Sequence, residues 1–403
     1  MSLFSPPLVS LFIFCTTALI AAATFGLAVA PDVDVPSVLQ LRPEGSACPN
    51  QPVDTVPRVS PPQAVARHVV LISVDGLRPD AITALGASGA PAFYELRRGG
   101  AFTDNARTDY AKTNTLPNHM SQLTGRAVMG SCGHNWTENG VPEEGATLHS
   151  NKGRYVASVF DVVHDHGLRT VTFASKSKFS LLAASYGFPH DTVASTDSGG
   201  RNHKLDKLVL KSDTDILTKA FIAELKTTQP NFAFLHLRDP DGKGHRYGWD
   251  VSQQSPYLQG VQRVDSLLGS VIGAIRADSV LGGTTTVILT ADHGGVGGNI
   301  REGHGHPYMR ASYTIPFYVW GSGVEAGADL YALNREVRRN PGRGRPSYQA
   351  VRQPIRNGDA ANLALTLLGL PGVPGSHINH AAASLAVSDR THWLEWGEEA
   401  VEN

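Results

Sequence analysis

The segment that decides the fold class is residues 68–76, whose sequence is HVVLISVDG. Its residues 69–74 form a short run of β-branched and apolar residues that ends at Asp75-Gly76, which is typical of a strand buried on both faces of a parallel sheet. Similar runs stand at 170–174, 231–237, 285–290 and 315–320, and helical patterns at 212–226, 257–275 and 359–368 separate or follow them. This alternation predicts one doubly wound α/β domain.

The two ends of the chain differ from this domain in composition. Residues 1–30 carry no charge, and most of them are apolar, which predicts a signal peptide or an uncleaved N-terminal membrane anchor. Residues 31–66 hold eight prolines and are expected to form an extended tether, and residues 391–403 are expected to form an acidic tail. We therefore place the folded domain at 67–390. We expect an exported protein that is secreted, periplasmic or membrane-anchored on the outside.

The composition excludes several classes of protein. Hydrophobic residues make up 41% of the chain and charged residues 18%, so a large core is possible and wholesale disorder is excluded. With 35 basic and 36 acidic residues, a groove that binds nucleic acid through bulk positive charge is not expected. Three cysteines are too few for a disulfide scaffold; Cys48 and Cys132 could form one disulfide after export or remain thiols.

Candidate metal ligands follow three of the expected strands. Asp75 ends the first, the segment RDPDGKGH at 238–245 follows the run at 231–237, and Asp292 and His293 follow the run at 285–290. The segment at 238–245 offers Asp239, Asp241 and His245, and a little later the segment EGHGH at 302–306 offers Glu302, His304 and His306. In open α/β sheets, ligands bind at the carboxyl ends of the strands. A lone aspartate after a strand is more often a cap, but carboxylates and imidazoles that recur at this edge predict two divalent cations, with zinc favoured.

Thr115 is the candidate nucleophile. It opens the segment TLPNH at 115–119, in which a proline near the start suits the first turn of a helix. In one interpretation Thr115 only caps this helix. In the other, its hydroxyl attacks a phosphoryl group that the positive potential of the helix N-terminus attracts, and a base or a metal must activate it.

These pieces occur in an order that resembles the type I phosphodiesterase/nucleotide pyrophosphatase branch of the alkaline phosphatase superfamily. The resemblance covers about residues 66–385. It rests on the segments 74–76, 115–119, 124–125, 240–248, 291–294, 304–305 and 368–371. It implies that 67–390 is an alkaline-phosphatase-like catalytic domain, a three-layer α/β/α sandwich with a mostly parallel central sheet.

The resemblance also implies roles for single residues. One cation would be held by Asp241, His245 and His304, the last preferred over His306 because a glycine directly follows the family's ligand. The other cation would be held by Asp75, Asp292 and His293, with Thr115 bridging as an alkoxide. His119 would not be a ligand.

Three further residues are implied to bind substrate. Asn139 matches the family's asparagine that contacts a phosphoryl oxygen, and Asn135 is its rival. Lys176 and Lys178 match a basic pair with which relatives such as phosphonoacetate hydrolase grip the anionic end of their substrate. Two lysines after a strand could equally begin a solvated helix.

The sequence therefore predicts an exported two-metal phosphoric ester hydrolase of the phosphodiester or nucleotide pyrophosphate type, which acts on a small phosphorylated substrate through a phosphothreonine. No protein partner is expected, although the N-terminal segment could attach the chain to a membrane. A phosphomonoesterase or phosphonate hydrolase that uses Lys176 and Lys178 is the alternative. A sulfatase is disfavoured because that branch has a modified cysteine or serine where Thr115 stands. An inactive metal-bound surface module would require a missing ligand or nucleophile, and none is missing.

Overall fold

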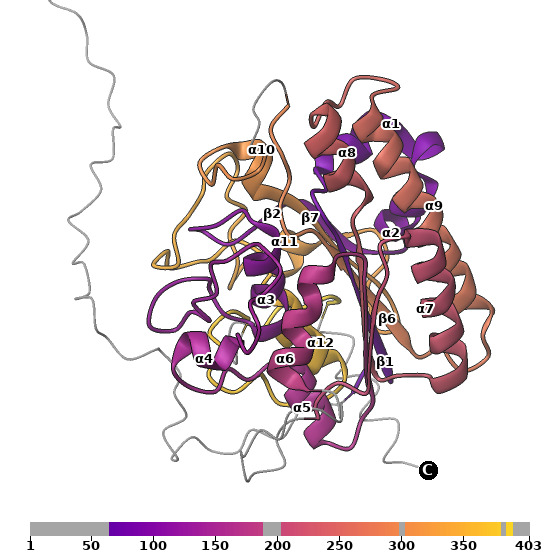
Figure 1. Ribbon diagram of the computed structural model, residues 1–403. Helices are drawn as coiled ribbons and strands as arrows, with labels where there is room; N and C mark the ends of the chain where they lie inside the picture. The colour runs from indigo at the N-terminus through magenta and orange to yellow at the C-terminus, as the bar shows by residue number, and fades with distance from the viewer. Residues whose placement is uncertain (1–63, 188–202, 298–302, 380–383, 390–403) are drawn as a thin grey trace, which may run out of the picture. The chain divides into compact units, whose positions relative to one another are not determined.

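A computed structural model describes residues 64–187, 203–297, 303–379 and 384–389 (Figure 1). The expected leader at 1–30 and the acidic tail at 391–403 lie outside these residues, as does all of the tether except 64–66, so the domain boundaries stay predictions. No helix in the described ranges is both long and apolar enough to cross a membrane. Cys132 is disulfide-bonded; its expected partner Cys48 lies outside the described residues.

Eight strands form one sheet in the order β4-β3-β5-β1-β6-β7-β2-β8. β7 is antiparallel to both of its neighbours, and the other neighbouring pairs are parallel. In chain order the strands are β1 His68–Val74, β2 Gly100–Arg107, β3 Thr170–Ala174, β4 Lys207–Leu210, β5 Phe232–Leu237, β6 Thr285–Thr290, β7 Thr314–Gly321 and β8 Ala328–Asp329.

Helices cover both faces of this sheet, as the ribbon shows (Figure 1). One layer consists of α1 Pro79–Gly89, α2 Pro91–Gly99, α7 Thr214–Thr228, α8 Asp239–Tyr247 and α9 Pro256–Ala277. The other contains α3 Thr115–Thr124, α4 Leu148–Lys152, α5 Val159–Asp165, α6 Ser180–Tyr186 and α12 Asp359–Leu367. The short elements η1 Ser177–Phe179, α10 Arg310–Tyr313 and α11 Leu330–Leu333 lie in connections. The prediction of a three-layer α/β/α sandwich is confirmed.

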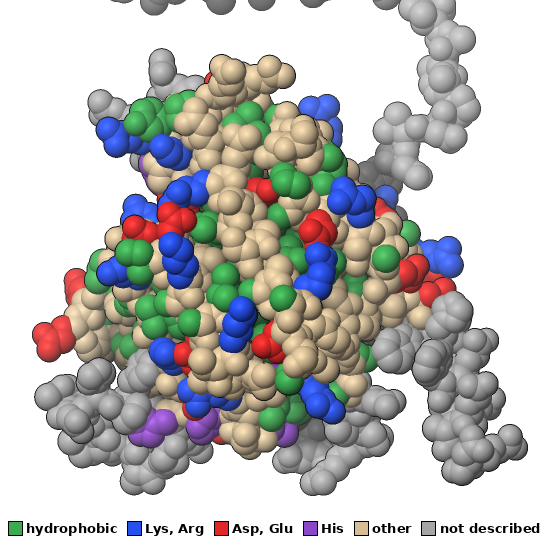
Figure 2. All heavy atoms as spheres, turned by 90° about the vertical axis from the view of Figure 1, so that its right-hand side faces the viewer, with side chains coloured by type: hydrophobic (Ala, Val, Ile, Leu, Met, Phe, Trp, Pro, Cys, Tyr) green, Lys and Arg blue, Asp and Glu red, His purple; other side chains and the backbone are tan. Residues whose placement is uncertain are grey.

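The centre of the sheet is buried on both faces, as the apolar run at 68–76 predicts. All seven residues of β1 are buried, and so are all residues of its neighbours β5 and β6. On the outer face of α7 and α9, basic and acidic side chains are interspersed (Figure 2), and Arg263 and Arg276 pair with carboxylates of neighbouring helices. Because β1 pairs in parallel with β5 and β6, the carboxyl ends of these three buried strands lie side by side at one edge of the sheet. The candidate site lies at this edge.

Candidate active site

The expected ligands gather at the carboxyl ends of β1, β5 and β6. Asp75 directly follows β1, and Asp292 and His293 follow β6. Asp241 and His245 lie one turn apart in α8, which begins two residues after β5. Because β1 pairs with both β5 and β6, the sheet brings these three ends together, and the loop after residue 302 adds His304.

Two groups of side chains have the spacing of a metal site. Asp75, Asp292 and His293 form one, and Asp241, His293 and His304 form the other; in each, one ligand atom per residue lies within 4.8 Å of the rest. His293 is thus common to both groups, whereas the family pattern assigns it to one. His245 lies beside the second group, with its Nε2 3.2 Å from Asp241 Oδ1.

Each carboxylate of these groups presents one buried oxygen without a hydrogen bond in the described part of the chain: Asp75 Oδ1, Asp241 Oδ1 and Asp292 Oδ2. The other oxygen is anchored. Asp292 Oδ1 accepts from the backbone N–H groups of Gly76 and His293, at 3.1 and 2.9 Å. A buried acceptor left without a partner costs free energy, so this pattern calls for a cation.

The two buried histidines present an unprotonated nitrogen to the same space. His293 Nδ1 donates to Gly294 O at 2.8 Å and His304 Nδ1 donates to Thr113 O at 2.8 Å. These bonds fix the tautomer and leave each Nε2 as a lone pair, the arrangement typical of metal-binding histidines.

His293 Nε2 therefore faces other acceptors. It lies 3.1 Å from Asp292 Oδ2 and 3.5 Å from Asp75 Oδ1. Burial, with His304 adding to the shift, lowers the pKa of His293 to about 3, so the ring is neutral. Burial and the nearby charge of Asp75 raise the pKa of Asp292 well above its usual range. A divalent cation would satisfy all of these atoms, and the mixed carboxylate and imidazole donors fit zinc.

Thr115 lies within reach of this cluster. It is buried, and its Oγ1 lies 3.3 Å from His293 Nε2. It is the first residue of α3, and the capping position is Asn114. The interpretation of Thr115 as the cap of the helix is therefore wrong, and its hydroxyl is free to face the carboxylates and imidazoles.

Asn139 lies at the N-terminus of α3, next to Thr115. Its Oδ1 accepts from the backbone N–H of Leu116 at 2.9 Å and from Lys178 Nζ at 3.1 Å. Its rival Asn135 lies elsewhere, with its backbone N–H bonded to Val128 O.

The two lysines have different surroundings, and neither is a freely solvated side chain. Lys178 contacts Asn139, and burial together with the charge of Lys176 lowers the pKa of Lys178. Lys176 Nζ instead lies 2.6 Å from both Asp75 Oδ2 and Asp241 Oδ2. Burial would lower the pKa of Lys176, but these carboxylates outweigh it and raise it.

A chain of buried hydrogen bonds that sequence reasoning missed supports Asp75. His236 Nε2 lies 2.9 Å from Asp75 Oδ2, and Ser175 Oγ lies 3.0 Å from His236 Nδ1. The available signal was a single histidine in the apolar strand β5. His119, which the family pattern excludes as a ligand, bonds Thr115 O and Ser73 Oγ and has a structural role.

Trp249 is a second residue that sequence reasoning missed. Its ring is buried and packs edge-on against His245 and His304, with centroids 5.0 and 5.9 Å away. Glycines make room for it: a Cβ at Gly244 or Gly295 would lie 2.2 or 2.3 Å from an indole atom. The cluster of glycines around the ligand motifs was the available signal.

We expect Gly295→Ala to destabilise the fold by about 1–3 kcal/mol or more, because the added methyl group meets a buried ring that cannot move away. Gly273→Ala in α9 is the matched control: nothing lies within 4 Å of its Cβ position, and alanine favours a helix. Denaturant unfolding measures both variants. Equal stabilities would contradict the packing role of Trp249.

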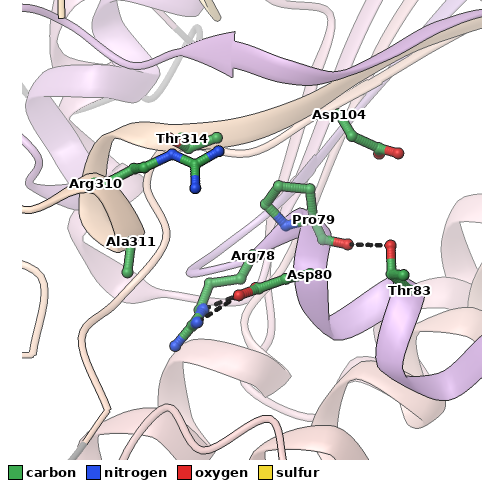
Figure 3. A pocket seen from close by; sticks show the side chains of 8 residues that line it. All are labelled: Arg78, Pro79, Asp80, Thr83, Asp104, Arg310, Ala311 and Thr314. Carbon is green, nitrogen blue, oxygen red and sulfur yellow. Dashed lines mark hydrogen bonds and ion pairs between the residues drawn. The ribbon is translucent and has the colours of Figure 1, made fainter. Parts of the chain in front are cut away.

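Arg78 and Ala311 line a cavity of about 370 Å³ (Figure 3). The loop after His293 lies close to both residues, because a Cβ added at Gly294 would be 2.0 Å from Ala311 O and 3.1 Å from Arg78 Cγ. Arg78 Nη1 donates to the carbonyls of Trp249 and Gly295, and the guanidinium also pairs with Asp80. Neither Thr115 nor an expected ligand lines the cavity. The two carbonyl contacts of Arg78 hold the loop after His293 in place.

Comparison with known proteins identifies the family. The family model described as type I phosphodiesterase / nucleotide pyrophosphatase matches residues 69–361. The chain belongs to this family. The match begins in β1 and ends in α12, and it therefore includes all of the expected ligands and Thr115.

Curated relatives of this family member include enzymes of two kinds. GPI ethanolamine phosphate transferase 1 of Mus musculus is 23% identical over 78% of this chain and 32% of its own length. Ectonucleotide pyrophosphatase/phosphodiesterase family member 1 of Homo sapiens is 25% identical over 56% of this chain and 23% of its own length. The chain spans less than a third of either relative.

Solved structures share the fold of this family member. Murine ectonucleotide pyrophosphatase/phosphodiesterase 5, an inactive variant in complex with AMP, matches with a TM-score of 0.53 and 14% identity over 76% of this chain and 96% of that one. A 2-O GAG sulfatase matches with a TM-score of 0.51 and 14% identity over 81% of this chain and 74% of that one. The expected alkaline-phosphatase-like architecture is confirmed.

Proposed function

We propose that this chain is a metal-dependent phosphoric ester hydrolase in which Thr115 is the nucleophile. The observation that carries the proposal is the place of the Thr115 hydroxyl, at the N-terminus of α3 and 3.3 Å from His293 Nε2. Around it lie carboxylate oxygens without hydrogen bonds and imidazole lone pairs. Two divalent cations, with zinc preferred by these donors, would supply positive charge that makes the hydroxyl a better nucleophile and neutralises phosphoryl oxygens.

The residues around Thr115 would bind the phosphoryl group. The N-terminus of α3 attracts an anion through its free N–H groups and its dipole. Because Leu116 N and Lys178 Nζ both donate to Asn139 Oδ1, the Asn139 amide N–H₂ remains available for a phosphoryl oxygen. The Lys178 ammonium adds a positive charge beside it.

The reaction we propose has two displacements. The Thr115 hydroxyl gives its proton to solvent and its oxygen forms a bond to phosphorus while the bond to the leaving oxygen breaks, which gives a phosphothreonine and a leaving group that takes up a proton. A water then attacks phosphorus and loses a proton, while the bond to the threonine oxygen breaks and that oxygen takes up a proton, which restores the hydroxyl. Positioning and charge neutralisation supply most of the acceleration, because negative charge spreads over the phosphoryl oxygens in the transition state.

The purified protein should contain about two divalent ions per chain, and a chelator should abolish hydrolysis reversibly. Elemental analysis and re-addition of single metals test this and also identify the metal. A metal-free preparation with full activity on a chromogenic phosphodiester would contradict the proposal. The inactive-module alternative predicts bound metal without turnover.

Substrate preference depends on Lys178. A monoester carries about one more negative charge than a diester at neutral pH, and a charge-assisted hydrogen bond contributes roughly 1.5–3 kcal/mol. We therefore expect Lys178→Ala to lower kcat/KM about ten- to a hundred-fold for monoesters or carboxylated phosphonates, and less for diesters. Kinetics on paired chromogenic substrates measure both. Equal losses on both substrate classes would show that Lys178 does not distinguish them by charge, and a phosphodiesterase would remain the favoured function. A nucleotide is then the first substrate to test.

A second candidate is transfer of the phosphoryl group to an alcohol. It is favoured by the match to GPI ethanolamine phosphate transferase 1, which covers more of this chain than the pyrophosphatase match does. Both reactions can share the first displacement and differ in what attacks the phosphothreonine. Product analysis in the presence of an acceptor alcohol distinguishes the two reactions. Hydrolysis joins the phosphoryl group to an oxygen from water, whereas transfer joins it to the alcohol and gives a new ester.

Export of the chain is part of the proposal. It rests on the uncharged, apolar segment at residues 1–30. Fractionation of expressing cells, with and without this segment, tests export and shows whether the segment is cleaved or anchors the chain.

A further inference from the structure

Lys176 lies between carboxylates of the two groups of candidate ligands. It directly precedes η1, in the connection that follows β3, and its side chain is 13% exposed. Its Nζ is 2.6 Å from Asp75 Oδ2 and 2.6 Å from Asp241 Oδ2. Both distances are those of strong charge-assisted hydrogen bonds.

The contacts of Lys176 separate it from the substrate position. Its ammonium bonds the anchored oxygens of Asp75 and Asp241, and the unbonded oxygen of each remains directed elsewhere. Lys178, two residues later, contacts Asn139 next to the nucleophile. The two lysines of the same connection thus serve different parts of the site.

The Lys176 ammonium offsets repulsion between buried carboxylates. Asp75, Asp241 and Asp292 are buried in two adjoining groups that share His293, where like charges repel strongly. His293 and His304, whose pKa values burial lowers, do not offset this repulsion, whereas a lysine ammonium is positive at neutral pH. Lys176 therefore occupies the place of a cation between carboxylates that belong to separate groups.

We propose that Lys176 is a built-in cation of the metal centre: it stabilises the metal-free protein, and its positive charge limits the affinity for divalent ions. The inference rests on the metal centre of the proposed function, but it does not depend on Thr115 or on the reaction. It assigns Lys176 as a positioning residue for Asp75 and Asp241, in place of the substrate-binding role that the family resemblance implies.

The test compares Lys176→Met with Lys178→Met, a matched control in the same connection. In chelator-treated protein, we expect Lys176→Met to lower Tm by about 5 °C or more, because two buried carboxylates lose the positive charge that pairs with both of them. In titration calorimetry, Lys176→Met should bind zinc at least about tenfold more tightly than wild type, because the ammonium that repels the metal ion has been removed. Lys178→Met should change both quantities less than Lys176→Met does, because the Lys178 ammonium bonds Asn139 and not a carboxylate of either group.

Lys176→Arg provides a second control, because it keeps the charge and should keep zinc affinity near wild type. A Lys176→Met protein that folds only when zinc is present would also agree with the proposal. Weaker or unchanged zinc binding in Lys176→Met, or an unchanged Tm without metal, would overturn it. If wild type binds no zinc or other divalent ion, the proposed function fails instead, and the Tm comparison still tests the stabilising role of Lys176.

Discussion

Replacing Thr115 by alanine is expected to lower kcat for phosphate esters by about 10³-fold or more, because loss of the nucleophile removes the whole covalent route. The fold should persist, because the change removes a hydroxyl and a methyl group from the first turn of α3. Metal content should also stay near wild type, because the aspartates and histidines of both groups remain. Steady-state kinetics and elemental analysis of the same preparation measure the two effects.

Thr115→Ser is the matched variant. It keeps the oxygen at the position 3.3 Å from His293 Nε2, so it should retain part of the activity with unchanged metal content. Turnover by Thr115→Ala within a few-fold of wild type would show that another group attacks phosphorus.

The second large effect concerns His293, which belongs to both groups of candidate ligands. We expect His293→Ala to reduce metal content toward zero, because each group loses one of its three members. His304→Ala removes a member of only one group and should leave about one ion per chain. Activity should fall by about a hundred-fold or more in both variants. Removing a residue that only orients a metal ligand already lowers activity by about ten- to a hundred-fold, and removing the ligand itself should lower it at least as much.

His306→Ala is the control for these variants. His306 is only partly buried and belongs to neither group, so its replacement should leave the metal content near two ions. A greater loss of metal in His306→Ala than in His304→Ala would overturn the choice between these two histidines. Equal metal content in His293→Ala and His304→Ala would show that His293 serves one site only.

Largely buried strands could be predicted well from the sequence, and partly exposed ones could not. The runs for β1, β3, β5, β6 and β7 coincide with the strands to within one residue at each end, because strands covered on both faces must be continuously apolar. β2 was not predicted because it mixes buried and partly exposed residues, and β4 because its residues lie partly exposed at the edge of the sheet. β8 has only two residues.

The candidate ligands could be predicted because each lies in a motif just after a strand, or in a short glycine-rich segment. Their mutual arrangement could not. That Asn114 rather than Thr115 occupies the capping position depends on backbone geometry, and the shared place of His293 depends on how two loops meet. The separation of Lys176 from Lys178 depends on the path of the chain after β3, which a basic-x-basic pattern does not specify.

The stereochemical course of hydrolysis at phosphorus distinguishes covalent catalysis by Thr115 from direct attack of water. A phosphorothioate diester of known configuration is hydrolysed in water labelled with a heavy oxygen isotope, and the configuration of the product is determined. Attack by Thr115 followed by attack of water inverts the configuration at phosphorus twice, so we expect net retention. Net inversion would mean that water attacks the substrate directly, and the assignment of Thr115 as a covalent nucleophile would be wrong.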